Sequence, residues 1–492
     1  MSAIILGEKP LCLKSAYKIA NGAIINLSPK IKINIDANRK LVENLAKTDI
    51  PYYGINTGFG FFANKKIPNC KQKELQKNII TSHASGWGSP LSIPETRLCM
   101  ALRLNVLTKG FTGVSYKLCE ALLKLITAEI YPIIPSYGSV GASGDLAPLA
   151  HLALPLIGKG KVHFKDKIMD ASEALKLAKI SPYELSEKEG LSLINGTQVM
   201  LSIGSIALIK ALSLLEYAEK IAALTFEALF AHLQPLDPRL HQLRRQEGQI
   251  ISAKKILEEL KGSYLHDNNL QRTRVQDPYS LRCAPQVHGA SRDALNYAKT
   301  ILERELDAVT DNPLVFDDSK DIISGGNFHG QPIAFALDIA SIALSELSNI
   351  SERRQELLLN PNTNRTNAFL AVEPGIDSGY MAAQYLSASL VNENKLLANP
   401  AVTDSIPGNV GIEDHVSMGM TSARKFRTIV ENCATVLSVE LLFAAQAIDL
   451  LNIKKLGNGT KVLYKKLREN VPMWSQERIL SEDIENARKV IT

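Results

Sequence analysis

Residues 138–151 set an Ala-Ser-Gly tripeptide among small residues and then turn apolar, as a loop entering a buried helix would. If the backbone bends sharply there, the amide nitrogen of Gly144 approaches the carbonyl carbon of Ala142, because glycine permits close backbone approach. Ring closure with loss of water, and loss of the Ser143 hydroxyl, would leave a methylene conjugated to an imidazolone, which is an electrophile. On spacing alone, an ordinary glycine-serine loop with Ser143 or Asp145 as a helix cap explains the same residues.

Two other segments hold side chains suited to proton transfer and to binding a ring. Residues 51–60 form a glycine-rich loop around Tyr53, and a tyrosine acts as a base only when donors or positive charge lower its pKa from about 10. Residues 75–86 place His83 near an expected helix end. Without further context, Tyr53 would serve packing and His83 would be a hydrogen-bonded structural residue.

Four later stretches add groups that bind carboxylates and amines. Arg282 lies in a polar segment, and a guanidinium grips a carboxylate through two parallel hydrogen bonds. Asn195 precedes an expected helix, as an N-cap near N–H groups that favour negative charge. Glu413 is expected to open the last long helix, and its carboxylate suits an imidazole N–H or an ammonium. Residues 325–330, Gly-Gly-Asn-Phe-His-Gly, are typical of a turn. Each residue has an alternative explanation: a surface ion pair for Arg282, a simple helix cap for Asn195 and the helix dipole for Glu413.

In order and spacing these strings resemble the signatures of the aromatic amino acid ammonia-lyases, and those of the histidine-specific branch most closely. The resemblance covers residues 53–419 and 471–484, nearly the whole chain. It implies that the tripeptide becomes the 4-methylideneimidazole-5-one (MIO) group, with Ala142 and Gly144 cross-linked and Ser143 dehydrated. It also implies that neither an external cofactor nor a metal is needed.

The resemblance further implies a role for each polar side chain. Tyr53 would be the base that removes the β-proton of the substrate, and Arg282 would hold its α-carboxylate. Asn195 would contact the prosthetic group and the substrate. The remaining positions would line the pocket: Gln276 and Tyr279 shape it, Tyr279 and Asn195 hold donors and water, Asn327 lies on the carboxylate side, Phe328 packs against MIO, and His83 and Glu413 hold the ring. We expect His329 to be structural.

His83 and Glu413 together favour L-histidine as the substrate, which would give trans-urocanate and ammonia in the first step of histidine degradation. In the family the substrate amine adds to the MIO methylene, or in an alternative scheme the aromatic ring attacks it. A tyrosine ammonia-lyase or aminomutase shares MIO and the Ser-His pair and is the nearer alternative. A non-catalytic helical assembly protein is the more distant one, and its mark would be loss of the tripeptide serine, the tyrosine or the arginine. Residues 408–412, Gly-Asn-Val-Gly-Ile, depart from the usual Thr-Ser-Ala-Asn-Gln of the histidine branch.

Composition sets the broad class of the protein. The 492 residues are 45% hydrophobic and 22% charged, which is typical of a globular chain with a large core. The net charge of +6 is spread without blocks of like charge, so neither nucleic-acid nor membrane binding is expected. Six cysteines lack metal-ligand spacing, the N-terminus lacks a secretory signal, and apolar runs are interrupted before they could cross a bilayer. We therefore expect a cytoplasmic protein.

Helical periodicity dominates the chain after its first few dozen residues. Long helices, apolar on wide faces, must pack side by side. They are expected from 191–198 to 229, from 331 to about 359, from 378 to about 397 and from 415 to about 451. A strand pair is expected at 161–164 and 167–169, followed by a capping box of Asp170 and Glu173.

The predicted fold class is mainly α, with the ammonia-lyase and fumarase-like architecture. Residues 1–200 would form a smaller N-terminal region that bears the MIO loop and the tyrosine loop. Residues 201–492 would form the bundle of long helices and a C-terminal helical segment. The resemblance implies a homotetramer that shares its active sites between subunits and acts on a small amino acid.

Overall fold

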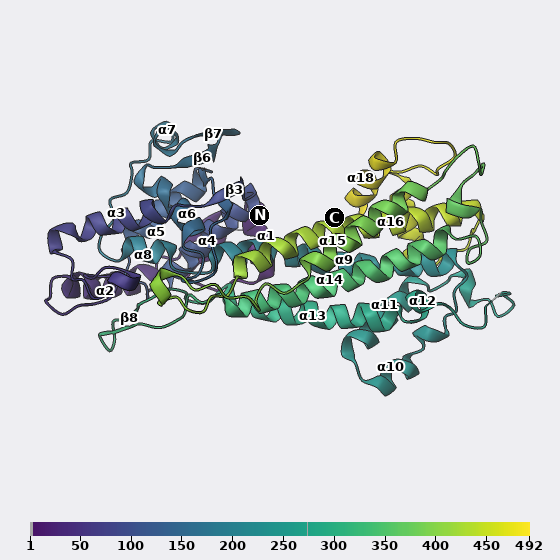
Figure 1. Ribbon diagram of the computed structural model, residues 1–492, viewed down its shortest axis with the longest axis horizontal. Helices are drawn as coiled ribbons and strands as arrows, with labels where there is room; N and C mark the ends of the chain where they lie inside the picture. The colour runs from purple at the N-terminus through teal and green to yellow at the C-terminus, as the bar shows by residue number, and fades with distance from the viewer. Residues whose placement is uncertain (1–2, 273) are drawn as a thin grey trace. The chain divides into compact units, whose positions relative to one another are not determined.

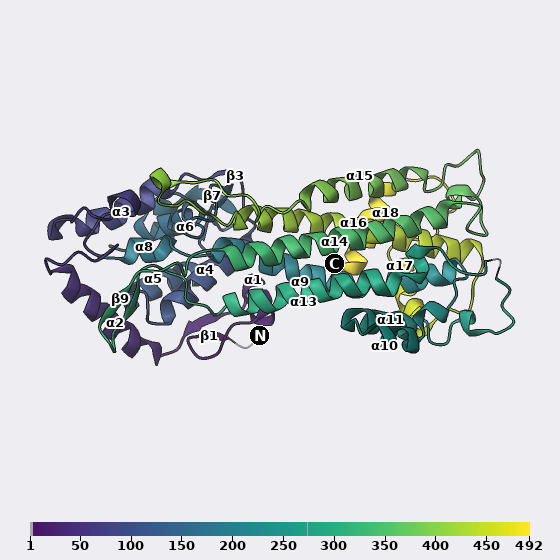
Figure 2. The ribbon, with the colours of Figure 1, turned by 60° about the horizontal axis from the view of Figure 1, so that its bottom comes forward.

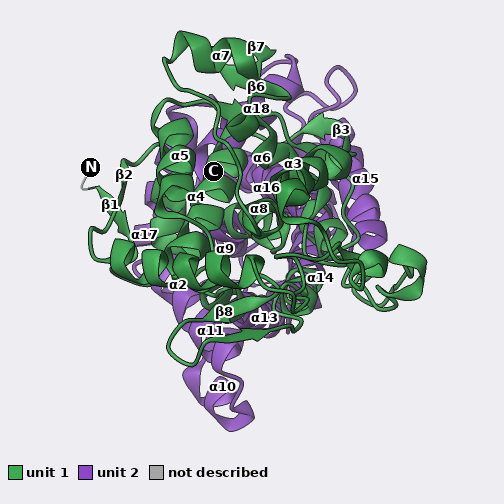
Figure 3. Ribbon diagram, turned by 90° about the vertical axis from the view of Figure 1, so that its left-hand side faces the viewer, with its two compact units in different colours: residues 1–206, 299–338, 400–424 green, residues 207–298, 339–399, 425–492 purple. Residues whose placement is uncertain are grey.

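The structure is a computed structural model that describes residues 3–272 and 274–492. It is mainly helical, which confirms the predicted fold class (Figure 1). The chain forms two compact units, which Figure 3 colours separately. Unit 1 contains residues 1–206, 299–338 and 400–424, and unit 2 contains residues 207–298, 339–399 and 425–492. The division into domains near residue 200 stays a prediction.

Unit 1 combines short helices with small strands. Its helices are α1 (Leu13–Ala20), α2 (Ile31–Ala46), α3 (Gln72–His83), α4 (Ile93–Thr108), α5 (Tyr116–Thr127), α6 (Ala147–Ala153), α7 (Ala171–Leu177) and α8 (Glu189–Ile194). Short 3-10 turns lie at η1 (Gly60–Phe62), η2 (Asn69–Lys71), η3 (Leu154–Ile157) and η7 (Asn409–Gly411). Strand β1 (Ile4–Leu6) pairs in parallel with β2 (Ile25–Leu27). In the antiparallel pairings β3 (Trp87–Pro90) pairs with β5 (Pro135–Tyr137), and β8 (Leu314–Phe316) pairs with β9 (Asp321–Ile323). A three-stranded antiparallel sheet has β6 (Lys161–Phe164) between β4 (Tyr131–Pro132) and β7 (Lys167–Asp170).

Helix α4 lies in the core of unit 1, because every side chain from Glu95 to Thr108 is buried. A capping box fixes its start: the Glu95 amide donates to Ser92 Oγ, and the Ser92 amide donates to Glu95 Oε2 at 2.9 Å. The helix also carries Arg97 and Arg103 into this core. A buried guanidinium must find acceptors there, which gives these two residues a structural task.

The strand pair at 161–164 and 167–169 is confirmed, with Lys161 opposite Asp170 and Phe164 opposite Lys167. The predicted capping box of Asp170 and Glu173 is wrong, since the Asp170 side chain makes no capping hydrogen bond to α7. Asp170 ends β7 instead, and its carboxylate lies 3.8 Å from Lys161 Nζ across the strand pair. A cross-strand ion pair has replaced the cap.

The remaining helices, which include the longest ones, lie wholly or mostly in unit 2. They are α9 (Gln198–Ala228), α10 (Pro238–Arg244), α11 (Glu247–Glu259), α12 (Tyr279–Arg282), α13 (Ala284–Glu305), α14 (Gln331–Leu359), α15 (Met381–Leu397), α16 (Gly419–Leu450), α17 (Asn458–Arg468) and α18 (Leu480–Ile491). Within unit 2, helices α13, α14, α15 and α16 run alongside one another (Figures 1 and 2). The predicted bundle of long helices is therefore present.

The predicted helix bounds are correct for α14 and α15 within a few residues, and two others need correction. The run from 191 to 229 is split into α8 and α9, because Asn195 has a non-helical backbone with φ −95° and ψ 90°. The last long helix begins at Gly419, so Glu413 lies in the segment before it and not in its first turn. The helix dipole therefore does not explain the position of Glu413.

Three helices, α9, α14 and α16, are long and apolar enough to cross a membrane by length and composition alone. This corrects the expectation that charges or glycines interrupt every apolar run too early. However, 72%, 72% and 83% of their most apolar windows is buried inside the protein. Helix packing accounts for their apolar character.

Unit 2 holds a fully buried ion pair that connects its helices. Arg354 on α14 donates to the carboxylate of Glu440 on α16 at 2.5 and 2.8 Å, and both side chains have no exposed surface. Thr225 on α9 donates to the same carboxylate at 2.8 Å. Arg354 Nη1 also lies 3.3 Å from His288 Nε2 on α13. One charged cluster thus joins four helices, and such a pair is tolerated because its polar atoms have partners.

We expect Arg354→Leu to lower the free energy of unfolding by about 3–5 kcal/mol, because it leaves the Glu440 charge buried without its partner. The measurement is the denaturant midpoint at a fixed protein concentration. The matched control is Arg353→Leu, since the neighbouring Arg353 side chain is 62% exposed and surface pairs contribute about 0–1 kcal/mol. Equal midpoints for the two variants would contradict the structural role of the buried pair.

Candidate active site

The Ala142-Ser143-Gly144 tripeptide lies in the loop before α6, where the backbone requires glycine. Gly141 and Gly144 both have φ of +75°, a conformation that residues with a Cβ rarely adopt. A Cβ at Gly144 would lie 2.2 Å from the carbonyl oxygen of Gly196. The Asp145 amide donates to that same oxygen at 2.7 Å. Two loops distant in sequence therefore meet backbone to backbone at the tripeptide.

Asp145 caps the start of α9 and not the helix that follows it directly. Its Oδ2 accepts from the amides of Val199 and Met200 at 2.8 and 3.0 Å, which satisfies N–H groups left free at a helix start. The carboxyl is fully buried, and this burial raises its pKa to about 7 although both N–H bonds oppose the change. The tripeptide loop is thus fixed to α9 by a group that titrates near neutral pH.

The segment before α16 covers the tripeptide with apolar side chains. Ala142 packs against Val416 and Met418 in one buried cluster. The Met418 amide donates to the Val140 carbonyl at 2.9 Å. The loop is therefore held between α9 and this segment, with an apolar surface beside Ala142.

Four of the predicted site residues lie together around the serine of the tripeptide. Ser143 Oγ donates to Glu413 Oε1 at 3.0 Å. The charge of Glu413 raises the pKa of both Tyr53 and His83. Each of the four side chains is half-buried. The structure thus brings a hydroxyl, a carboxylate, a phenol and an imidazole into one polar cluster.

His83 is the last residue of α3, at the expected helix end. Its Nδ1 lies 3.1 Å from Ser82 Oγ. Burial lowers the pKa of the imidazole and outweighs the opposing effect of Glu413. His83 is therefore a neutral ring near pH 7, with one nitrogen able to donate and the other able to accept.

Tyr53 receives a hydrogen bond at its phenol oxygen. The Gly60 amide donates to Tyr53 Oη at 3.2 Å, and Phe59 packs edge-on against the ring at 6.4 Å between centroids. Burial raises the pKa of Tyr53, the Gly60 N–H partly offsets this, and Glu413 raises the pKa further. Tyr53 can act as a base near neutral pH only when positive charge comes close to it.

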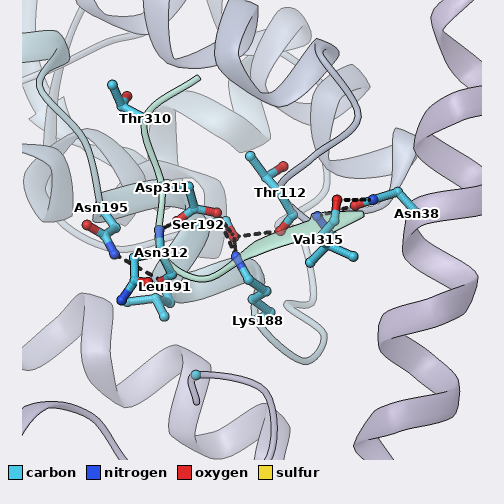
Figure 4. A network of polar contacts seen from close by, with 12 residues as sticks. Asn38, Thr112, Lys188, Leu191, Ser192, Asn195, Thr310, Asp311, Asn312 and Val315 are labelled. Atoms are coloured by element: carbon cyan, nitrogen blue, oxygen red, sulfur yellow. Dashed lines mark hydrogen bonds and ion pairs between the residues drawn. The ribbon is translucent and has the colours of Figure 1, made fainter. Parts of the chain in front are cut away.

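Asn195 lies in the break between α8 and α9, where only one of its two side-chain polar atoms is hydrogen-bonded. Nδ2 donates to the Asn312 carbonyl at 3.1 Å (Figure 4). Oδ1 is buried and has no hydrogen-bond partner in the described part of the chain. A buried acceptor without a donor is costly, so this oxygen is suited to a donor from a ligand.

A buried ion pair supports the backbone on which Asn195 rests. Lys188 Nζ lies 2.6 Å from Asp311 Oδ2, and both side chains have no exposed surface. Ser192 Oγ donates to the same Oδ2 at 3.0 Å, and the Asn312 amide donates to Oδ1 at 2.9 Å (Figure 4). The pair thereby fixes the Asn312 peptide, which in turn orients Asn195.

Arg103, on α4, binds the backbone of the break between α8 and α9. Its guanidinium donates to the carbonyls of Ser192, Asn195 and Thr310 and to Gln198 Oε1. The group is fully buried, and burial lowers its pKa to about 10, so it stays protonated at neutral pH. A charged side chain with several acceptors can hold an irregular backbone that no regular helix hydrogen bonds stabilise.

Asn327 and Phe328 lie in the segment between β9 and α14, with Asn327 exposed and Phe328 half-buried. The next residue links this segment to the one that carries Glu413. The His329 and His415 rings are stacked at 5.9 Å, and His329 Nε2 lies 3.3 Å from the His415 carbonyl. His329 therefore has the packing role expected of a structural residue.

Gln276, Tyr279 and Arg282 belong to unit 2, apart in the chain from the cluster described above. The Arg282 guanidinium lies over the Tyr279 ring at 4.5 Å, and Arg282 Nε is buried without a hydrogen-bond partner among the described residues. Gln276 and Arg282 line a groove of about 730 Å³. Tyr279 is 70% exposed. Within unit 2 these residues form a polar surface able to bind a carboxylate.

The surroundings of the tripeptide fit an MIO group. The backbone approach of Gly144 and Gly196 leaves no room for a side chain, the Asn195 Oδ1 acceptor has no partner among residues 3–272 and 274–492, and the cover over Ala142 is apolar. The described residues contain no group of three or more His, Cys, Asp or Glu side chains with metal-binding geometry.

Comparisons with known proteins agree with this arrangement. A family profile described as aromatic amino acid lyase matches residues 11–469. The histidine ammonia-lyase of Treponema denticola is 48% identical over 473 residues, which is 96% of this chain and 93% of that protein. The solved histidine ammonia-lyase from Trypanosoma cruzi superposes with a TM-score of 0.92 at 39% identity, covering 100% of this chain and 93% of that one. Tyrosine aminomutase from Streptomyces globisporus gives a TM-score of 0.94 at 35% identity, with coverage of 100% and 97%.

The helical fold, the site and these matches together define a carbon–nitrogen lyase. The chain belongs to the aromatic amino acid lyase family. Its fold is shared with the ammonia-lyases and aminomutases of that family.

Sequence reasoning missed the buried charged residues behind the site: Arg103, Lys188 and Asp311. One signal was available, since Arg103 stands in the apolar run of residues 98–107, where a charge needs a buried partner. Lys188 and Asp311 carry no such signal, because both stand among polar residues in the sequence. Asp145 was considered only as a local cap.

We expect Asp145→Asn to change how stability depends on pH. Because the pKa of Asp145 is about 7 in the folded protein and about 4 when unfolded, the folded state favours the protonated form. Its stabilising effect is complete below pH 4 and is lost as the pH rises to about 7. The melting temperature of the wild type should therefore fall relative to Asp145→Asn between pH 5 and pH 7.5. If the melting temperatures of the two proteins change with pH in parallel across this range, Asp145 does not titrate there.

Proposed function

We propose that the protein eliminates ammonia from L-histidine to give trans-urocanate. The observation that carries the proposal is the hydrogen bond between Ser143 and Glu413, with His83 in the field of the same carboxylate. It puts a carboxylate and a neutral imidazole beside the tripeptide, which suits a substrate with an ammonium and a ring N–H. The relative from Treponema denticola, a histidine ammonia-lyase, supports the same substrate.

We further propose that Ala142, Ser143 and Gly144 mature into MIO. When formed, this group supplies an electrophile for the substrate. Asn195 would stand beside it, with the free Oδ1 ready to accept a hydrogen bond from the substrate ammonium, while the Gly196 carbonyl and the apolar cover over Ala142 keep the group in position and exclude water.

Tyr53 is the proposed base for the β-proton. Elimination breaks the Cα–N and Cβ–H bonds and forms a carbon–carbon double bond, so a proton acceptor must stand on the β-carbon side. The pKa of Tyr53 is raised in the free protein, and a substrate ammonium beside the phenol would lower it. Gly60 N–H stabilises the phenolate in the same complex.

Arg282 is proposed to hold the substrate carboxylate, with Gln276 and Tyr279 beside it. In a homotetramer whose active sites are shared, these side chains would come from another subunit than the tripeptide. Asn327 would stand on the carboxylate side and Phe328 against the prosthetic group. The unpartnered Arg282 Nε supports a role in binding an anion.

The physiological role that follows is the first step of histidine degradation in the cytoplasm, on a free amino acid. A tyrosine ammonia-lyase or aminomutase is the second candidate, because the aminomutase from Streptomyces globisporus shares the fold at 35% identity. Glu413 favours histidine, since a phenol ring offers a carboxylate a hydroxyl donor but no ring N–H.

We expect the intact mass of the wild type to fall short of the sequence mass by two water molecules. Ser143→Ala should show the full sequence mass and should form no urocanate from L-histidine, followed by ultraviolet absorbance. Ser319→Ala, an exposed serine in the turn between β8 and β9, is the control and should keep the short mass. A wild type of full mass without product would overturn both the MIO and the elimination proposals.

We expect Glu413→Gln to lower kcat/KM for L-histidine by roughly ten- to a hundredfold, because a charged hydrogen bond becomes a neutral one. Rates with L-tyrosine should change less, so the selectivity for histidine narrows. Asp414→Asn, at the exposed neighbouring position, should retain the wild-type selectivity. Coumarate as the main product of the wild type would move the assignment to the tyrosine enzymes.

A further inference from the structure

Two loops of unit 1 meet at Asn409, a residue to which the proposed chemistry gives no role. Residues 408–413 form a narrow turn, closed by hydrogen bonds between the backbones of Gly408 and Glu413 at 2.9 and 3.3 Å. Asn409 has φ of +52° in this turn, which asparagine tolerates better than most residues. The side chain of Asn409 is therefore carried at a fixed place relative to Glu413.

Asn409 contacts the tyrosine loop at two adjacent residues. Its Oδ1 accepts from the Phe61 amide at 3.2 Å. Its amide also lies against Gly60, since a Cβ at Gly60 would be 2.1 Å from Asn409 Nδ2. The Gly60 amide donates to Tyr53 Oη at 3.2 Å. The amides of two consecutive residues therefore have different acceptors: the Phe61 N–H donates to Asn409, and the Gly60 N–H donates to the phenol of Tyr53.

The contact is exposed, so its value lies in orientation more than in stability. Water can replace Asn409 as an acceptor for the Phe61 amide without a large cost. Water cannot, however, hold the peptide of a glycine with φ of +53° in one orientation. The side chain that packs on Gly60 limits the rotation of the N–H that reaches Tyr53.

We propose that Asn409 is a positioning residue for Tyr53, which clamps the Gly60–Phe61 backbone so that the Gly60 N–H stays on the phenol oxygen. This rests on the proposed role of Tyr53 as the base. The same turn carries Glu413, so the clamp also sets the tyrosine loop against the residue beside Ser143.

The clamp has a consequence for the pH dependence of activity. Burial and the charge of Glu413 raise the pKa of Tyr53, and the Gly60 N–H lowers it. Glu413, on the turn, is the charged group whose field acts on the phenol, and Phe59 covers an edge of the ring. Loss of the clamp removes the lowering contribution. In the enzyme–substrate complex, where the substrate ammonium brings the pKa of Tyr53 down, this moves the acid limb of kcat to higher pH.

The test compares Asn409→Ala with Val410→Ala, which alters the next residue of the turn, 81% exposed, and removes no polar group. Asn409→Ala should lower kcat by roughly three- to tenfold and shift the acid limb upward by roughly half to one pH unit, with an intact mass still short by two water molecules. Val410→Ala should behave as the wild type. An unshifted acid limb in Asn409→Ala would overturn the positioning role, even if kcat falls.

Hydrogen exchange separates the clamp from the chemistry. In Asn409→Ala, backbone amides in a peptide covering residues 54–62 should exchange faster than in the wild type. Asn409→Asp, which keeps an oxygen acceptor, should retain the slow exchange. Unchanged exchange in Asn409→Ala would show that no clamp exists. If the wild type forms no product from histidine or tyrosine while exchange still rises in Asn409→Ala, the proposed function fails and the contact between the loops stands.

Discussion

The site depends on one close approach, that of the Gly144 and Gly196 backbones. The hydrogen bond from the Asp145 amide to the Gly196 carbonyl fixes this approach at 2.7 Å. Everything around it follows: Asp145 can reach the start of α9, Asn195 stands beside the tripeptide, and the segment before α16 can close over Ala142. Neither position has room for a side chain: a Cβ at Gly144 would lie 2.2 Å from the Gly196 carbonyl oxygen, and a Cβ at Gly196 would lie 2.4 Å from Arg103 Nη1 and from Gln198 Oε1.

Buried charged side chains stabilise the backbone around this contact. Arg103 binds the carbonyls of the break between α8 and α9, and the Lys188–Asp311 pair fixes the peptide of Asn312. Buried ion pairs contribute little net stability, since desolvation offsets their attraction. Their effect is specificity of geometry: an irregular backbone with free carbonyls is acceptable in a core only when cations satisfy those carbonyls. The acidic and basic residues of the polar cluster can then remain half-buried.

The sequence predicted the long helices and the polar cluster better than it predicted the buried charged residues that support them. Apolar periodicity marks α14 and α15, because a bundle helix must bury a wide face. It does not show the break at Asn195, where apolar residues continue on both sides and buried charges from other segments hold the backbone; only the capping tendency of asparagine points to a helix start there. It fails again at Glu413, since acidic residues near a helix do not report whether they lie inside its first turn. Tyr53, His83 and Ser143 are recognisable by the family motifs, whereas Lys188 and Asp311 gain meaning only when the fold brings them together.

The side chain of Asn409 fills the space that a side chain at Gly60 would need. The two positions are therefore sterically coupled. A side chain at residue 60 would need a smaller residue 409 and would still be strained by the φ of +53°, and a bulkier residue 409 would demand that residue 60 remain glycine. Sequence change in the turn near Glu413 is thus restricted by the loop of the tyrosine, and relatives that differ at one of these positions should differ at the other in a compensating direction.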